Sequence, residues 1–65
     1  MKVRLLGDKK VANAKRFKDM SQEEVDDSVC DPENFDSEDI FIEPKAKIGV
    51  FWEYVSDEEV EVISE

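Results

Sequence analysis

The sequence predicts an α+β fold made of an N-terminal strand, one or two short helices and a three-stranded antiparallel β-meander. Three observations predict it. Residues 1–6 alternate between apolar and basic side chains, a capping-box sequence begins at Ser21, and three segments after residue 38 carry β-branched and aromatic residues between turn formers. The chain has 65 residues, so we expect residues 1–65 to form a single small acidic domain with one small core.

A strand and then a helix are predicted for residues 1–19. Val3 and Leu5 alternate with basic residues, which is the period of a half-buried strand. Asp8 can cap a helix over residues 9–19, because the apolar residues there recur at helical spacing with the basic residues opposite. These apolar residues are Val11, Ala14 and Phe17.

A second, short helix is predicted over residues 22–29. Ser21 and Glu24 form the S-x-x-E pattern of a capping box, in which each residue's side chain bonds the other's backbone N–H. Met20 and Val25 occupy the two positions of a hydrophobic staple. The helix is expected to end before the Asp-Pro pair that follows, because the residue before proline disfavours the helical region.

The rest of the chain predicts a loop followed by the meander. Residues 31–39 are polar, with Phe35 as the one side chain able to anchor the loop to a core. Strands are predicted over residues 39–43, 48–55 and 59–63, because apolar and β-branched residues in these segments are bounded by turn formers.

The middle strand of this meander is predicted to be apolar on both faces. Trp52 and Tyr54 share the face that also carries Ile48 and Val50, and the opposite face carries Phe51 and Val55. If the first face packs on the helices, Phe51 and Val55 are expected to contribute to a homodimer or a partner interface. The residues of the first face are Ile48, Val50, Trp52 and Tyr54.

The charges divide the chain into two unequal parts. Residues 1–18 carry a formal charge of +6, residues 19–65 carry −15, and the whole chain carries −9. The acidic part also holds most of the aromatic and β-branched residues, so it is expected to fold rather than to form a disordered acidic tail.

The residue types argue against catalysis, cofactors and metals. The chain has no histidine and no glycine-rich phosphate loop, and its one cysteine, Cys30, lies near Asp27 and Asp31, whose charges would raise a thiol pKa. The acidic loop 31–39 departs from the calcium-loop pattern, since a proline follows its first aspartate and no glycine stands at the sixth position. We therefore expect no enzyme, no cofactor and no metal site.

A single cysteine cannot form an internal disulfide, and a secreted domain of this size would be expected to carry several. The sequence therefore predicts a cytoplasmic protein. The longest apolar run, residues 48–52, is far too short to span a membrane, so no membrane association is expected.

These observations predict a small acidic binding protein that docks on a basic surface of another protein. A nucleic-acid-binding enzyme or regulator presents such a surface, and an acidic domain could inhibit or regulate it as a mimic of DNA. In size, charge and lack of catalytic residues the chain resembles small acidic inhibitors encoded by bacteriophages and mobile elements. The candidate contacts are Glu23, Glu24, Asp26, Asp27, Glu59 and Glu61, with Phe51 as an apolar anchor.

The alternative is a nucleic-acid-associated or structural accessory protein that uses its basic N-terminal helix. Basic side chains could contact phosphates, and Phe17 could stack on a base. The same basic residues could instead dock on the domain's own carboxylates, which would neutralise them within the molecule. The residues concerned are Lys9, Lys10, Lys15, Arg16 and Lys18.

Overall fold

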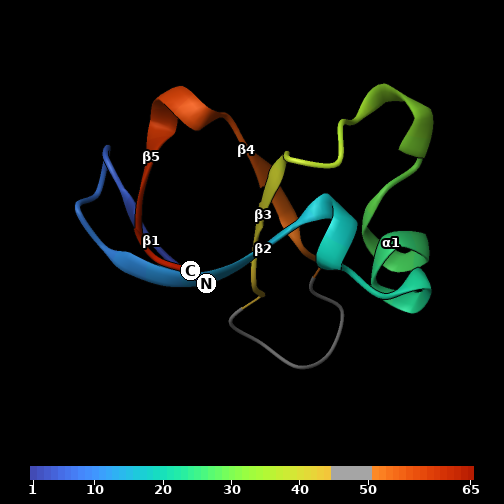
Figure 1. Cartoon of the computed structure of the whole chain (residues 1–65), viewed down its shortest axis with the longest axis horizontal. Coiled ribbons are helices and arrows are strands. Elements are labelled where there is room, and N and C mark those ends of the chain that lie inside the picture. Colours follow the sequence, from blue (N-terminus) through green and yellow to red (C-terminus); the bar gives the residue numbers. More distant parts are fainter. Residues whose placement is uncertain (45–50) are drawn as a thin grey trace.

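The computed structural model describes residues 1–44 and 51–65, and in them it shows one α-helix and a five-stranded antiparallel sheet (Figure 1). The α+β class is therefore as predicted. The strands are β1 (Lys2–Leu5), β2 (Val11–Arg16), β3 (Ile40–Ile42), β4 (Glu53–Val55) and β5 (Val60–Ser64). The helix is α1 (Gln22–Ser28), and three short 3-10 turns are η1 (Phe17–Asp19), η2 (Pro32–Asn34) and η3 (Asp57–Glu59).

The strands follow the order β4-β3-β2-β1-β5, and β2 is shared by the two halves of the sheet. The first half of β2 pairs with β1, for example at Val3 and Ala12, and its second half pairs with β3, where Lys15 lies opposite Phe41. The ribbon in Figure 1 bends strongly along β2, so the two halves of the sheet face different directions. A strand that passes from one half of a sheet to the other is a common way to make such a corner.

The predicted meander is correct for β3 and β4 and wrong for the last strand. After β4, η3 carries the chain across the molecule, and β5 pairs with β1 instead of β4. The register places Val60 opposite Leu5 and Val62 opposite Val3, with an irregularity between Lys2 and Val3. Alternating residues indicate a strand but do not name its partner. Here the partner is the edge of β1 that β2 leaves free, and the inner face of β1 is apolar.

The predicted helix over residues 9–19 is wrong, because this segment forms β2 and η1. The connection from β1 closes through the Leu5 N–H, which donates to the Lys10 carbonyl at 2.8 Å, and the Lys9 N–H, which donates to the Leu5 carbonyl at 2.6 Å. Val11 and Ala14 share a face at helical spacing, but in β2 they lie on opposite faces, since Val11 is 56% exposed and Ala14 is buried in the inner core. Pairing with both β1 and β3 outweighed the helix propensity of the two alanines.

The second predicted helix is confirmed with its cap. The Glu24 N–H donates to Ser21 Oγ at 3.1 Å, and the Ser21 N–H donates to Glu24 Oε1 at 2.8 Å, which is the complete capping box. The staple residues Met20 and Val25 are both buried in one cluster. The helix ends at Ser28, one residue before the predicted end.

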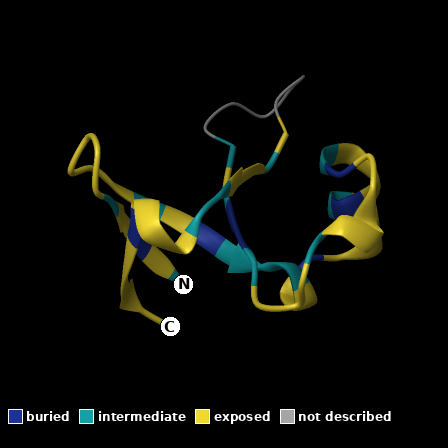
Figure 2. Cartoon of the chain, turned by 90° about the horizontal axis from the view of Figure 1, so that it is seen from above, coloured by how far each residue is buried: buried dark blue, intermediate teal, exposed yellow. Residues whose placement is uncertain are grey.

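Two hydrophobic cores lie on opposite faces of the sheet and meet at β3. Ile40 is 2% exposed in the inner core and Phe41 is 1% exposed in the outer core. Figure 2 shows buried residues both on the strands and on the segment that carries α1. Phe35 anchors its loop as predicted, since its ring centroid lies 5.3 Å from that of Phe41. The inner core is Val3, Ala14, Ile40 and Val60, and the outer core is Met20, Val25, Val29 and Phe41.

The predicted strand over residues 48–55 is observed only as β4, and residues 48–50 lie outside the described part of the chain. Trp52 packs against the outer core and the Tyr54 ring lies 5.7 Å from the Phe41 ring, so these two side chains share a face as predicted. Val55 packs against the inner core, so its expected place in an interface is wrong. Phe51 is 58% exposed.

Truncating Phe41 should unfold the protein, because its side chain fills the outer core and connects the lobe that carries α1 to the sheet. Phe41→Ala is expected to cost about 3–5 kcal/mol of unfolding free energy. Phe51→Ala removes the same atoms from an exposed position and should change stability by less than about 0.5 kcal/mol. Urea denaturation followed by circular dichroism measures both. Equal losses in the two variants would contradict the two-core description.

Candidate functional site

The strongest accumulation of charge in the fold is the segment between β2 and β3. Residues 19–39, here called the acidic lobe, contain α1 and η2 and hold ten carboxylate residues with no lysine or arginine. In Figures 1 and 2 this lobe lies on the opposite side of the molecule from the turn between β1 and β2. Its side chains therefore form a surface of one sign at one end of the protein.

The acidic lobe is attached to the sheet by both apolar and polar contacts. Val25 and Val29 enter the outer core, and the Trp52 N–H donates to Ser28 Oγ at 3.0 Å. Lys15 Nζ on β2 donates to both carboxylate oxygens of Glu24 at 3.1 Å and lies 5.3 Å from the centre of the Trp52 ring. These contacts fix the orientation of α1.

Glu24 helps to hold α1 on the sheet, although the sequence suggested it as a contact for a partner. The hydrogen bond from the Ser21 backbone is the main cause that lowers the pKa of Glu24; partial burial opposes it, and Lys15 adds to it. Both carboxylate oxygens already accept hydrogen bonds within the molecule. The capping-box pattern in the sequence was the signal that Glu24 has a structural role.

Three carboxylates of α1 point outward and are exposed. Glu23 stands three and four residues before Asp26 and Asp27, so the three side chains lie on one side of the helix. Asp26 accepts a hydrogen bond from Gln22 Nε2 at 2.9 Å. The last turn of α1 has no basic residue, so the two aspartates stand next to its negative end. This surface is here called the α1 carboxylate face.

The other two predicted acidic contacts lie at the opposite end of the molecule. Glu59 belongs to η3 rather than to a strand, so the predicted regular row of Glu59 and Glu61 along one strand is wrong. Glu61 is on β5 and accepts a hydrogen bond from Arg4 Nη1 at 3.0 Å. Phe51 immediately precedes Trp52, whose N–H contacts α1, so it stands beside the acidic lobe. The structure thus separates Glu59 and Glu61 from the α1 carboxylate face.

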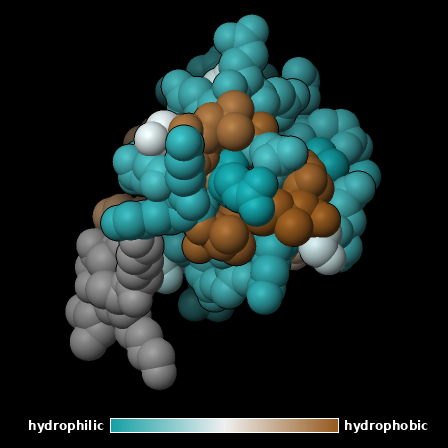
Figure 3. Space-filling view, turned by 90° about the vertical axis from the view of Figure 1, so that its left-hand side faces the viewer, coloured by the Kyte–Doolittle hydropathy of each residue, from teal (hydrophilic) through white to brown (hydrophobic). Residues whose placement is uncertain are grey.

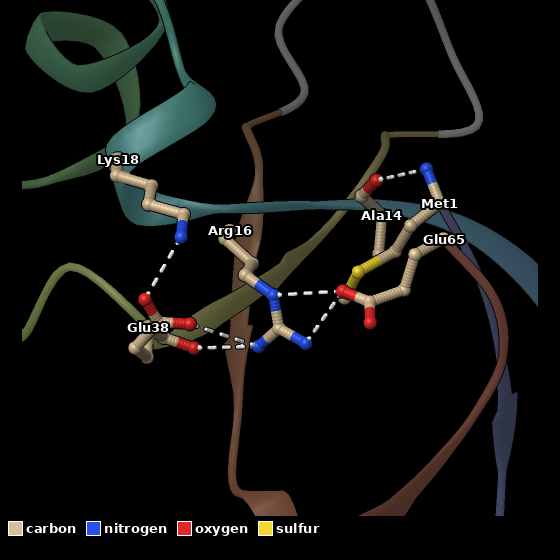
Figure 4. A network of polar contacts seen from close by, with 6 residues as sticks. All are labelled: Met1, Ala14, Arg16, Lys18, Glu38 and Glu65. Atoms are coloured by element: carbon tan, nitrogen blue, oxygen red, sulfur yellow. Dashed lines mark hydrogen bonds and ion pairs between the residues drawn. The ribbon is translucent and has the colours of Figure 1, made fainter.

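Part of the predicted basic surface is used inside the molecule (Figure 4). Arg16 Nε and Nη2 donate to Glu65 Oε1 at 3.2 and 2.8 Å, and Arg16 Nη1 lies 3.5 Å from Glu38 Oε2. Lys18 Nζ lies 2.9 Å from Glu38 Oε1, and this hydrogen bond raises the pKa of Lys18 and lowers that of Glu38. Neutralisation within the molecule therefore occurs for these residues.

The remaining basic candidates differ in their surroundings. Lys15 is held by Glu24, as described above. Lys9 and Lys10 lie in the turn between β1 and β2, are exposed, and make no ion pair with any residue in the ranges 1–44 and 51–65. The five residues predicted as one basic helix are thus distributed over a turn, a strand and a 3-10 turn.

Comparisons with known proteins gave no relative. No protein-family model, no curated protein and no solved structure matches this chain. Within the described residues, no three His, Cys, Asp or Glu side chains are grouped so that they could hold a metal ion. Nor does that part of the chain contain a helix with the length and apolar character needed to cross a membrane.

Replacing Glu24 should lower the free energy of unfolding by an amount that depends on pH, which would reveal its structural role. The pKa of Glu24 is lowered in the folded state, so its carboxylate stabilises the fold above the unfolded pKa of about 4.3, and this contribution is lost as pH falls through the lower folded value. Glu24→Gln can keep the capping-box hydrogen bond but loses the charge that pairs with Lys15, so it should cost about 0.2–1 kcal/mol at pH 7, and the difference from the unmodified protein should shrink at pH 3. Chemical denaturation at both pH values measures it.

The matched control is Glu23→Gln, because Glu23 is exposed on the same helix and outside the capping box. This variant should show no loss at neutral pH. An equal loss for Glu23→Gln and Glu24→Gln would mean that the capping box and Lys15 do not hold α1.

Proposed function

We propose that this chain is a small acidic binding protein that docks on a basic surface of another protein through its acidic lobe and inhibits or regulates that protein. The observation that carries the proposal is the α1 carboxylate face. Its residues are exposed and face one direction, and two of them, Asp26 and Asp27, stand in the last turn, where a carboxylate weakens the helix.

The cost to the helix distinguishes this surface from acids that only keep a protein soluble. Like charges three or four residues apart repel by about 0.2–0.5 kcal/mol per pair, and carboxylates in the last turn oppose the helix dipole. Solubility is equally well served by exposed acids elsewhere, such as those of η3. A basic partner would turn the repulsion within α1 into attraction across an interface.

The partner best suited to this surface is a protein with a groove that binds nucleic acid. Such a groove concentrates lysine and arginine side chains, and long-range attraction would bring an acidic domain to it as it brings DNA. Phe51 stands beside the lobe and is 58% exposed, which suits an apolar anchor. The exposed, free thiol of Cys30 suits a reducing cytoplasm. In this proposal the chain is not an enzyme and acts as a mimic of nucleic acid.

The alternative, direct binding of nucleic acid by the basic residues, has weaker support. Arg16 and Lys18 are paired with carboxylates, and Lys15 helps to hold α1 in place. Only Lys9 and Lys10 of the predicted basic set stand outside such pairs within the described residues. Two lysines supply few phosphate contacts for a nucleic-acid-binding surface.

Asp27→Lys should stabilise the fold and Asp57→Asn should not. The lysine removes repulsion with Glu23 and complements the negative end of α1, a gain of about 0.3–1 kcal/mol. Asp57 stands in the first turn of η3, where a carboxylate is favourable, so its loss should be neutral or slightly destabilising. Urea denaturation of both variants measures the change. A destabilised Asp27→Lys variant would remove the argument that the carboxylate is kept at a cost.

The binding test compares two triple variants that lose the same charge. Baits carrying Glu23→Gln, Asp26→Asn and Asp27→Asn, or Glu43→Gln, Glu53→Gln and Glu58→Gln, are used beside the unmodified chain to capture proteins from the native host. We expect a basic protein that binds the unmodified and second baits, is lost from the first by tenfold or more, and is released by duplex DNA.

Two results of this capture would contradict the proposal. One is a captured protein that both triple variants retain equally, which would place the contact elsewhere. The other is retention of DNA by the unmodified chain alone in a gel-shift assay at low salt, abolished by Lys9→Ala and Lys10→Ala, which would favour the nucleic-acid alternative.

A further inference from the structure

The longer of the two edge strands of the sheet is β5. It has five residues, whereas β4 at the other edge has three. Within residues 1–44 and 51–65, no strand pairs with the side of β5 that faces away from β1. A strand in this position leaves backbone N–H and C=O groups without a partner, and such groups can pair with a strand of another chain.

The register of β1 and β5 identifies the backbone groups at this free edge. The Leu6 N–H donates to the Glu59 carbonyl at 2.9 Å, which makes these two residues a hydrogen-bonded pair. Because successive residues of an antiparallel strand turn their backbone groups to alternate sides, Glu61 bonds to β1, while Val60 and Val62 turn theirs to the free edge. Among the described residues, no hydrogen bond outside the β1–β5 ladder uses the backbone groups of these two valines.

The side chains of β5 divide between the two faces of the sheet. Val62 lies opposite Val3, which is fully buried in the inner core, so Val60 and Val62 point to the inner face. Val62 is nevertheless 39% exposed. Glu61 points to the outer face. An added strand would therefore meet apolar side chains on one face and a carboxylate on the other.

A hollow beside this edge has room for apolar side chains. Its volume is about 240 Å³, and it extends from Val60 and Val62 on β5 to Ile40 on β3. Arg16 and Asp57 complete its lining, and the guanidinium of Arg16 is already paired with carboxylates. Inward-pointing side chains of an added strand would enter this hollow and cover Val62. Figure 3, which views the molecule from the side of β1 and β5, shows hydrophobic residues reaching the surface between hydrophilic ones.

The charges on the elements that form this edge are acidic. Residues 51–65 contain six carboxylate residues and no lysine or arginine. Within the described residues the carboxylates of η3 make no ion pair, and Glu61 pairs with Arg4. An added strand would lie about 4.8 Å from β5 and about twice that distance from β1. The lysines and arginine of β1 and of its turn to β2 therefore stand one strand further from the free edge than the acids of β5 do.

β1 shows the kind of strand that β5 accepts on its other side. Residues 2–5 alternate between basic and apolar side chains. Val3 lies opposite Val62 on the inner face, and Arg4 donates a hydrogen bond to Glu61 at 3.0 Å on the outer face. The free side of β5 presents the same valines and the same carboxylate, so a strand with the same alternation fits it. A second copy of β5 would instead place like charges opposite each other, which is unfavourable.

We propose that the free edge of β5 binds an extended segment of another protein in which apolar residues alternate with lysine or arginine. The segment adds a strand to the sheet through backbone hydrogen bonds to Val60 and Val62. Its apolar side chains enter the hollow, and its basic side chains lie beside Glu61 and η3. This inference goes beyond the proposed function, which concerns the acidic lobe at the other end of the molecule, and does not depend on it.

A titration of the full chain with a synthetic strand tests this binding. The probe is a peptide, blocked at both ends, that alternates valine with lysine over the length of β5. Hydrogen exchange followed by NMR on the isotope-labelled chain reports on each backbone amide. Bound peptide should slow the exchange of the Val62 amide by tenfold or more and leave the amides of α1 unchanged, because new backbone bonds form only at the edge.

Two variants with the same change of charge separate the edge from general attraction to an acidic protein. Val62→Lys places a charge on the inner side of the edge strand, which natural sheets use to prevent pairing, and should weaken peptide binding by tenfold or more. Val11→Lys makes the same substitution at a valine that is 56% exposed on β2, and should change binding by less than about threefold. Circular dichroism confirms the fold of both variants.

Two methylated peptides give the same test without changing the protein. One carries methyl groups on the valine nitrogens and the other on the lysine nitrogens, so each keeps all side chains and loses the donors of one edge. One of the two should bind at least tenfold more weakly than the other, because only one edge of the peptide pairs with β5.

The variant that tests the proposed function separates the two surfaces. The chain with Glu23→Gln, Asp26→Asn and Asp27→Asn should bind the unmethylated peptide at the β5 edge as the unmodified chain does. If this variant loses the peptide, the contact belongs to the acidic lobe and the inference is wrong, while the proposed function is unaffected.

Four further results would overturn the inference. The first is an unchanged exchange rate of the Val62 amide when the peptide is bound. The second is equal binding of the two methylated peptides. The third is a folded Val62→Lys variant that binds the peptide as well as Val11→Lys does. The fourth is exchange at Val62 that slows with protein concentration in the absence of peptide, because the occupant would then be a second copy.

Discussion

Both hydrophobic cores depend on strand β3, whose three side chains point alternately to the two faces of the sheet. Ile40 and Ile42 point into the inner core, and Phe41 between them points into the outer core. A register shift of one residue would exchange these faces, so the pairing of β3 with β2 and β4 determines both cores together. The seven-residue helix α1 is too short to be stable alone, and it depends on the outer core that Phe41 fills.

This arrangement also explains how a small chain separates its charges. The lobe that covers the outer face of β3 and β4 contains no basic residue, while β1 and the turn after it supply exposed lysines on the far side. Lys15, Arg16 and Lys18 lie on the junction between the two ends and are paired with carboxylates. The end that carries the lobe is thus acidic, and the opposite end carries both exposed lysines and the exposed acids of η3 and β5.

Local patterns in the sequence were sufficient for the elements that local interactions determine. The capping box at Ser21 and the alternation around Phe41 predicted α1 and β3, and Phe35 was found as an anchor because it is the one apolar residue in its loop. The helix predicted for residues 9–19 was wrong because the prediction used local spacing alone, and pairing with β1 and β3 makes this segment a strand. The predicted pairing of the last strand with β4 was wrong for the same reason, because the pairing of β5 with β1 is also long-range.

The candidate site also has one part that local patterns predict and one part that depends on long-range pairing. That Glu23, Asp26 and Asp27 lie on one side of α1 follows from the predicted helix, because a helix places neighbours at fixed spacing. Their separation from Glu59 and Glu61 depends on the strand order, which no local pattern contains. The central claim is that the outward carboxylates of the acidic lobe meet a protein partner. A photo-crosslinking residue at position 27, compared with one at the exposed position 13 on β2, tests it directly in the native host. The account predicts a specific crosslink to a basic protein from position 27 and none to that protein from position 13; a crosslink from position 13 alone would contradict it.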